Sequence, residues 1–311
     1  MIRRPDMPPD MTVEFAGLRL KNPVIAASGT FGYGLEWASL LDLNELGGLV
    51  TKGLSLEPMP GNPPPRLAVT PSGMINYIGL QNVGVDAFIR QKLPKLAAVR
   101  TAIIANVFGT SVEEYAEVVR RLEDAPGLAA YELNLSSPNS KGGGMVFGSD
   151  LRLLAEVTAA ARKVSRRPLI AKLTPNVADI APFAQAAEDA GADAISLVNT
   201  FTGMDTERQG AHPRLPGGVG GISGPVIHLE ALRLVEQAVR AVRIPIIGIG
   251  GILCGADAAE FLRAGAVAVQ VGTANFYDPL ATVRIVRELE AGCRDHGLDR
   301  VGDLRSVTGS M

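Results

Sequence analysis

The sequence predicts an α/β domain built as a (β/α)8 barrel, and three observations carry this prediction. Short apolar runs alternate with amphipathic stretches eight times along the chain, which is the pattern of a parallel sheet. The runs are almost uninterruptedly apolar, as in strands that are buried on both faces. Polar residues and glycines follow nearly every run, where the C-terminal ends of barrel strands would meet at one mouth. A doubly wound open sheet is the rival architecture, but the first run is not followed by a GxGxxG turn.

The predicted elements follow one another in strict order within a single domain, 1–311, that begins with a short tail, 1–12. The eight predicted strands are 23–29, 48–53, 101–109, 131–135, 168–174, 194–200, 245–251 and 266–273. The predicted helices are 35–46, 83–98, 112–123, about 150–164, 180–190, one that follows Gly224 and ends at Val242, 256–264 and 280–291. Gly- and Pro-rich excursions at 54–80 and 201–224 follow the second and sixth strands, so we expect them to roof the mouth together with the loop at 138–149.

The fourth strand and the loop after it form the stretch YELNLSSPNSKGGG at 131–144. The strand ends before Pro138, because proline lacks a backbone donor and restricts the residue before it. Its tip presents Asn134, Ser137 and Asn139 under a Gly-rich loop, which favours a functional site. An ordinary turn with Asn and Ser as capping residues is the alternative.

Composition excludes several classes of function. The chain has 30 basic and 32 acidic residues, a net charge of −2, and no basic stripe, so nucleic acid is not an expected partner. No apolar run is long enough to span a membrane, and the N-terminus lacks the apolar stretch of a signal peptide. Two cysteines and three scattered histidines support no disulfide framework, metal site or iron–sulfur cluster. We therefore expect a cytoplasmic protein without a metal.

The residues at the predicted strand ends suggest a binding site. They are Ser28, Thr51, Lys52, Asn106, Asn134, Ser137, Lys172, Asn199, Thr200, Gly250, Gly251, Gly272 and Thr273. Two lysines among several amides would suit a flat, polar, anionic molecule. The glycine turns after the last two strands are typical of a barrel phosphate site. A general base would be Ser137, a lysine or a carboxylate, although no Asp or Glu lies at these strand ends.

The segments that carry these residues resemble the dihydroorotate dehydrogenases of class 1, from residue 23 to about residue 279. The most specific segments are ASGTFGYG (27–34), TKG (51–53), NYIGLQN (76–82), NLSSPN (134–139), AKL (171–173), VNT (198–200), GGISGP (220–225), GIGG (248–251) and VQVGT (269–273). The resemblance implies oxidation of dihydroorotate to orotate in pyrimidine biosynthesis, with a proton leaving C5 and a hydride passing from C6 to the N5 atom of FMN.

The resemblance also implies roles for individual residues. It places FMN against Ser28, Lys52, Gly53, Asn106, Asn134, Lys172, Val198, Gly224, Gly250, Gly251, Gly272 and Thr273. It places the substrate against Lys52, Asn76, Tyr77, Ile78, Gly79, Leu80, Asn134, Asn199 and Thr200. Lys52 suits the N1/O2 edge of a reduced flavin, because a cation stabilises the anionic ring. The same lysine can pair with the orotate carboxylate, and Ser137 matches the position of the base.

Ser137 is also where the chain departs from its nearest subgroup. The stretch KGGGMVFGSD and the lack of an N-terminal membrane helix resemble the NAD-linked 1B catalytic subunit, which usually has cysteine at this position. A thiol can be tuned toward neutral pH whereas a hydroxyl cannot, so a slower or relay-dependent proton transfer is expected. The resemblance implies a partner subunit with FAD and a 2Fe–2S cluster, and an assembly that is either a homodimer core or a heterotetramer.

Several other functional hypotheses are compatible with the sequence. A fumarate-linked homodimeric dihydroorotate dehydrogenase would need no partner subunit. A dihydropyrimidine dehydrogenase-like reductase would act on uracil, which has no carboxylate for Lys52, and a dihydrouridine synthase-like enzyme would want a basic face. A phosphosugar isomerase-like barrel would use only the glycine turns, to bind the phosphate of its substrate. A flavin-binding or structural subunit would fit Ser137 as a degraded catalytic position.

Overall fold

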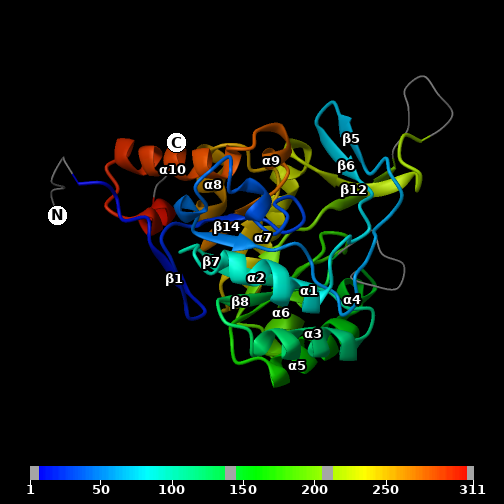
Figure 1. Ribbon diagram of the computed structural model, residues 1–311. Helices are drawn as coiled ribbons and strands as arrows, with labels where there is room; N and C mark the ends of the chain where they lie inside the picture. The colour runs from blue at the N-terminus through cyan, green and yellow to red at the C-terminus, as the bar shows by residue number, and fades with distance from the viewer. Residues whose placement is uncertain (1–6, 137–144, 205–212, 307–311) are drawn as a thin grey trace.

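A closed barrel of eight parallel strands forms the centre of the molecule, which confirms the predicted architecture (Figure 1). The structure, a computed structural model, describes residues 7–136, 145–204 and 213–306. In barrel order the strands are β3 (Val24–Ala26), β4 (Gly48–Val50), β7 (Ala102–Val107), β8 (Ala130–Asn134), β9 (Leu169–Lys172), β10 (Ala194–Leu197), β13 (Ile246–Ile249) and β14 (Ala268–Val271). The barrel closes where β14 pairs with β3, with Val269 opposite Val24.

Helices surround the barrel and follow the strands in sequence. They are α1 (Val85–Ala87), α2 (Leu93–Leu96), α3 (Val112–Glu123), α4 (Met145–Ser149), α5 (Leu151–Val164), α6 (Ala181–Asp189), α7 (His228–Ala241), α8 (Gly255–Arg263), α9 (Ala274–Tyr277) and α10 (Ala281–Asp295). Two begin at side-chain caps that the sequence supplies: Ser111 accepts from the backbone N–H of Glu114, and Asp150 caps α5. None of the helices in the described ranges is long and apolar enough to cross a membrane.

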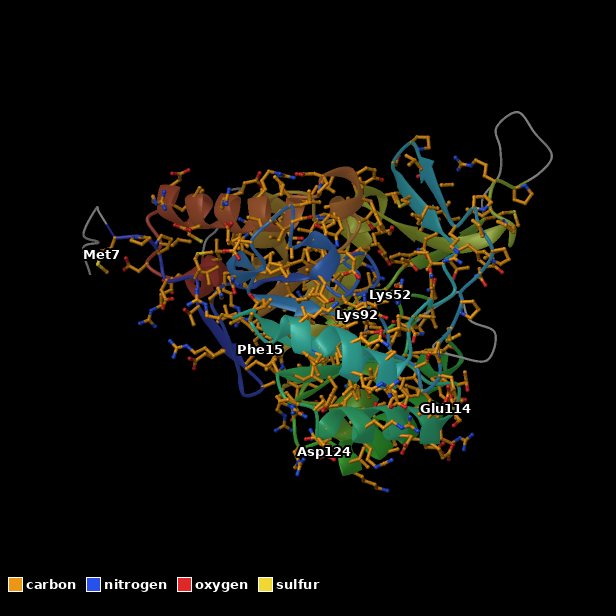
Figure 2. All side chains as sticks on the ribbon, viewed as in Figure 1. Met7, Phe15, Lys52, Lys92, Glu114 and Asp124 are labelled. Atoms are coloured by element: carbon orange, nitrogen blue, oxygen red, sulfur yellow. The ribbon has the colours of Figure 1, made fainter. Side chains whose placement is uncertain are left out.

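The N-terminal end of the barrel interior is apolar. Each strand contributes one inward side chain to a buried cluster: Ile25, Val50, Ile104, Ala130, Ile170, Ala194, Ile247 and Ala268. Phe15, Leu18 and Leu20 of the hairpin β1 (Val13–Phe15) and β2 (Leu18–Leu20) pack against this cluster and close that end. Figure 2 shows Phe15 on the side of β1, and Lys52 toward the side that carries the antiparallel strands.

The next inward layer is mostly polar. Because successive side chains of a strand point to opposite faces, the next inward residue lies two positions further along. Counting two from each member of the apolar layer reaches Ala27, Lys52, Asn106, Glu132, Lys172, Ser196, Ile249 and Gln270. The interior therefore changes from hydrocarbon to hydrogen-bonding groups within one layer, at the height where the mouth opens.

Two predicted regions have a different structure from the one expected. The excursions after the second and sixth strands were expected as loops. They instead contain β5 (Leu67–Thr70), β6 (Gly73–Asn76), β11 (Phe201–Met204) and β12 (Val219–Ser223), which pair as one sheet in the order β11-β12-β6-β5. In Figure 1 this sheet lies on the side of the barrel away from β1. Its strands are short, and all except β5 contain glycine, which hides the alternation that identifies a strand.

The helix predicted at 35–46 is wrong. The chain makes only two 3-10 turns there, Leu35–Trp37 and Leu43–Glu45. Between them the Asp42 carboxylate accepts from the backbone N–H of Asn44 and starts a new turn, a local bond that competes with helix formation. The helix predicted at 83–98 is confirmed as one unbroken helical stretch over 85–96, in which α1 and α2 flank a π-type turn at Phe88–Lys92.

Candidate active site

One cavity opens at the C-terminal mouth of the barrel, beneath the antiparallel sheet. Its lining comes from all eight barrel strands or the turns that follow them, and from the roof. The predicted site residues that line it are Ser28, Lys52, Gly53, Asn76, Ile78, Gly79, Leu80, Asn106, Asn134, Lys172, Val198, Asn199, Thr200, Gly224, Gly250, Gly251, Gly272 and Thr273. Gln270 and Phe276 line it as well.

Glu132 forms the centre of the polar layer below this cavity. Its carboxylate is fully buried. Oε1 accepts from Asn106 Nδ2 at 2.7 Å, and Oε2 accepts from Ser196 Oγ at 2.9 Å and from Gln270 Nε2 at 2.6 Å. Lys172 Nζ lies 3.5 Å from Oε1. One carboxylate on β8 thus joins side chains from β7, β9, β10 and β14.

Two acceptor atoms of this layer have no partner among the described residues. They are Oδ1 of Asn106 and Oε1 of Gln270, both buried in side chains that line the cavity. A carboxylate can only accept, so each amide must turn its NH2 group to Glu132 and its oxygen away from it. Buried polar atoms normally have partners, so these oxygens indicate a missing ligand donor. The Thr200 hydroxyl, also in the lining, is unpartnered in the same way.

The two predicted lysines have different surroundings. Lys172 is buried, with its ammonium 3.3 Å from Ser28 Oγ and near Glu132. No carboxylate within ion-pair distance of Lys52 is found in the described ranges. Burial lowers the pKa of the Lys52 ammonium, and the positive charge of Arg66 lowers it further. A cation with no carboxylate partner among the described residues, in a partly buried position, is well placed to attract an anionic ligand.

A chain of amides and hydroxyls lies along another wall of the cavity. Asn199 Nδ2 donates to Ser136 Oγ at 2.9 Å, and Ser136 Oγ lies 3.3 Å from Asn134 Oδ1. The Tyr115 hydroxyl donates to the backbone carbonyl of Asn134 at 2.7 Å. The roof adds Asn76, whose Nδ2 donates to the carbonyl of Gly221 at 3.1 Å. These bonds fix amide groups whose edges match the polar edge of a heterocycle.

The turns after β13 and β14 have the shape expected of an anion site. Gly250 and Gly251 have φ values of 136° and 68°, which strongly favour glycine. A Cβ at either position would also approach α7, at 2.6 Å from Ala231 Cβ or 2.7 Å from His228 Cβ. Gly272 also lines the cavity, and a Cβ there would be in ordinary van der Waals contact with Ala27 and Thr30, at 3.6 Å or more.

Two outcomes differ from the predicted site. The prediction for Ser137 is untested, because this residue lies outside the described residues. Tyr77 does not line the cavity, since its ring packs so closely against Gly217 that a Cβ there would lie 2.6 Å from it. Glu132, Ser196 and Gln270 were missed. Their signal was a polar residue inside an apolar strand, at an even spacing from the inward residues, as in YELN, AISL and AVQV.

No group of three or more His, Cys, Asp or Glu side chains that could hold a metal ion is found in residues 7–136, 145–204 and 213–306. Neither Cys254 nor Cys293 is part of a disulfide.

Comparison with known proteins gives a consistent result. A model of the dihydroorotate dehydrogenase family matches residues 10–292. A Solibacter usitatus protein named putative dihydroorotate dehydrogenase A (fumarate) is 56% identical over 298 residues, which cover 96% of this chain and 98% of that protein. The catalytic subunit of dihydroorotate dehydrogenase B (NAD(+)) from Pelobacter propionicus is 55% identical over 298 residues, with the same shares covered. That of a Geobacter species is 53% identical over 296 residues, covering 95% of this chain and 97% of its own length.

Proposed function

Because the chain belongs to the dihydroorotate dehydrogenase family, we propose that the cavity at the barrel mouth binds FMN and dihydroorotate and is where dihydroorotate is oxidised to orotate. The activity is that of an FMN-dependent oxidoreductase of pyrimidine biosynthesis. The observation that carries the assignment of the site is a single cavity with two lysines, a wall of fixed amides and unpartnered buried acceptors. Each of these features matches a group of the two ligands.

The cavity residues fit FMN. Gly250 and Gly251, with their positive φ angles, and Gly272 line the cavity in the turns after β13 and β14, where barrels commonly bind a phosphate. The buried oxygens of Asn106 and Gln270 would accept from ligand N–H or O–H groups. The Lys172 ammonium offers a cation to an electron-rich ring edge. Bound FMN supplies the acceptor for the hydride that the substrate loses.

The substrate would lie against the free lysine and the amides. Lys52 has no carboxylate partner in the described residues, so its ammonium would pair with the orotate carboxylate. Asn134 and Asn199 are held by Ser136, and Asn76 by the roof sheet, so their amides are oriented before the substrate arrives. The antiparallel sheet above them would keep water from the reacting carbons.

Proton removal is assigned to Ser137, on the match of its motif alone. We expect Ser137→Ala to slow flavin reduction by about a hundredfold or more, because general-base catalysis contributes at least that factor. The measurement is anaerobic stopped-flow mixing of dihydroorotate with the FMN-loaded protein, followed by flavin absorbance. Ser137→Cys is the matched variant that restores a base. Unchanged rates in Ser137→Ala would remove Ser137 from the mechanism, and no bleaching in the wild type, with dithionite still effective, would reject the substrate.

The route by which electrons leave the flavin is a finer proposal. We propose NAD as the final acceptor, reached through a partner subunit that carries FAD and a 2Fe–2S cluster, in a cytoplasmic complex. Several relatives are named as NAD-linked catalytic subunits, and a family member of that kind needs a partner. The cavity rim is suited to docking, since Phe276, which lines the cavity, is 39% exposed and Tyr277 is 48% exposed.

Fumarate is the second candidate, because one relative at 56% identity is named as fumarate-linked. The two acceptors are separated by reoxidation of the reduced protein alone. We expect slow reoxidation by both NAD and fumarate until an electron-transfer subunit is added, which would restore the reaction with NAD. Rapid reoxidation by fumarate without a second subunit would overturn the NAD proposal and leave the assigned substrate intact.

A further inference from the structure

Glu132 has no direct contact with the cavity, yet its carboxylate determines what the cavity floor offers. It is absent from the cavity lining, whereas Asn106, Lys172 and Gln270, which it binds, all belong to that lining. Its two oxygens receive three hydrogen bonds and face one ammonium. A fully buried carboxylate with this set of donors fixes the orientation of every group that it contacts.

The two amides could otherwise present either end to a ligand. An amide carries a donor NH2 group and an acceptor oxygen of similar size, so its orientation is decided by the partner it finds. Glu132 accepts at 2.7 Å from Asn106 and at 2.6 Å from Gln270. Both NH2 groups are thereby used, and both oxygens are left without a partner in the described residues.

We propose that Glu132 is a positioning residue that fixes the hydrogen-bond polarity of the cavity floor, so that Asn106 and Gln270 present acceptor oxygens to N–H and O–H groups of the bound cofactor. This inference rests on the proposed function. Oxidised FMN offers such donors in the ring N–H at N3 and in the ribityl hydroxyls. The carboxylate also partly offsets the charge of Lys172, which lies 3.5 Å away.

Replacing Glu132 by glutamine makes the proposal testable, because the change removes one acceptor and keeps the shape. The oxygen of the new amide at position 132 would stay toward Lys172 and Asn106, since an NH2 group would be repelled by the ammonium. The NH2 group of that amide would then face Ser196, which can accept, and Gln270, which must flip. The flipped Gln270 would present a donor to the cavity where the wild type presents an acceptor.

The measurement is the dissociation constant of FMN, from the quenching of flavin fluorescence on titration with apoprotein. We expect Glu132→Gln to raise it by about tenfold, the cost of mismatching one buried hydrogen bond. The midpoint potential of the bound flavin should rise in the same variant, because Lys172 is no longer offset by a negative charge. A role confined to folding would change neither quantity in protein that is fully folded at the temperature used.

The reciprocal exchange, Glu132→Gln with Gln270→Glu, provides the rescue. A carboxylate at position 270 is an acceptor on both oxygens, so it can bind the NH2 group of the amide at position 132 and still offer an oxygen to the cavity. We expect the double variant, which has the net charge of the wild type, to bind FMN more tightly than Glu132→Gln alone. Glu123→Gln, a buried carboxylate away from the cavity, is the matched control and should bind FMN as the wild type does.

The outcomes separate the two proposals. If the wild type does not bind FMN, the proposed function fails. If the wild type binds FMN and Glu132→Gln binds it equally well, or the double variant is no better than the single one, Glu132 does not set the polarity of the floor. Should Glu132→Gln not fold, Gln270→Leu removes one acceptor while Glu132 keeps its other partners. Unchanged FMN affinity in that variant would overturn the inference as well.

Discussion

Glu123 and Glu132 are both buried carboxylates, and their surroundings differ in the way that separates a structural cluster from a site. Glu123, at the end of α3, accepts from the Tyr131 hydroxyl at 2.9 Å and pairs with Arg166 and Arg167. Burial raises the pKa of the Tyr131 hydroxyl, which therefore stays protonated as a donor. Arg167 also donates to backbone carbonyls, including that of Glu123 at 2.7 Å.

Glu132 lies on the other face of the same strand as Tyr131, because neighbouring residues of a strand point in opposite directions. Its single cation is 3.5 Å away, its donors are neutral, and two of those donors keep an acceptor without a partner among the residues that the structure describes. Burial alone therefore does not identify function. Unused hydrogen-bonding capacity in side chains that line a cavity does identify a site, because a stable interior would have used it.

The largest expected effect is a difference in stability between alanine variants of the two buried glutamates. Glu132→Ala would leave the Lys172 ammonium buried without a counterion and three donors unpaired, at a cost of about 3–5 kcal/mol in the free energy of unfolding. Glu123→Ala should cost about 1 kcal/mol, because Arg166 is 75% exposed and Arg167 keeps its backbone acceptors. Chemical denaturation of the two apoproteins measures both, and equal losses would break the distinction.

Lys52 differs from Lys172 because its ammonium pairs with no carboxylate among the described residues. Lys52→Met should lower kcat/KM for dihydroorotate by at least about a hundredfold, since the substrate carboxylate loses its cation in a site shielded from water. The apoprotein should be as stable as the wild type or more so, because burial already disfavours the charged ammonium. Lys95→Met, an exposed lysine on α2, is the control. A folding defect in Lys52→Met would assign Lys52 a structural role.

A smaller effect is expected in the pH dependence of kcat/KM for dihydroorotate. The pKa of Lys52 is lowered from the ordinary value of 10.5, so kcat/KM should fall on an alkaline limb that begins below that pH. Arg66 contributes to the lowering, and Arg66→Gln should move the limb to higher pH. Between the lowered pKa and 10.5 the unfolded chain binds more protons at Lys52 than the folded one, so this residue makes stability rise with pH in that window. Lys52→Met should abolish both effects.

The sequence was sufficient for the barrel because each strand is a buried apolar run and each helix has its own period. The strands ending near Asn106, Asn134 and Lys172 were all found within a few residues. The roof sheet was not found, since β6 and β12 carry glycines at positions where alternation would show. The turns around Asp42 escaped because local side-chain bonds override helix propensity.

The site was predictable where a polar residue ends an apolar run, as at Lys52 and Asn199. The residues of the polar layer one step further into the barrel were not predictable. Glu132, Ser196 and Gln270 lie inside their strands. From the sequence alone, a polar residue inside a strand is equally consistent with a side chain that faces solvent. Only closure of the barrel shows that these positions face one another. The role of Ser137 stays a prediction, as it lies outside the described residues.

The most direct test compares the two buried carboxylates in one experiment. FMN-loaded Glu132→Gln and Glu123→Gln are mixed anaerobically with dihydroorotate, at a temperature at which both are fully folded, and flavin absorbance is followed. We predict that Glu123→Gln bleaches at the wild-type rate. Glu132→Gln should bleach at least about tenfold more slowly, because the mismatched floor misplaces the flavin against the substrate and this outweighs the greater driving force from its raised potential. Equal rates in the two variants would contradict the claim that the polar layer around Glu132 organises the active site.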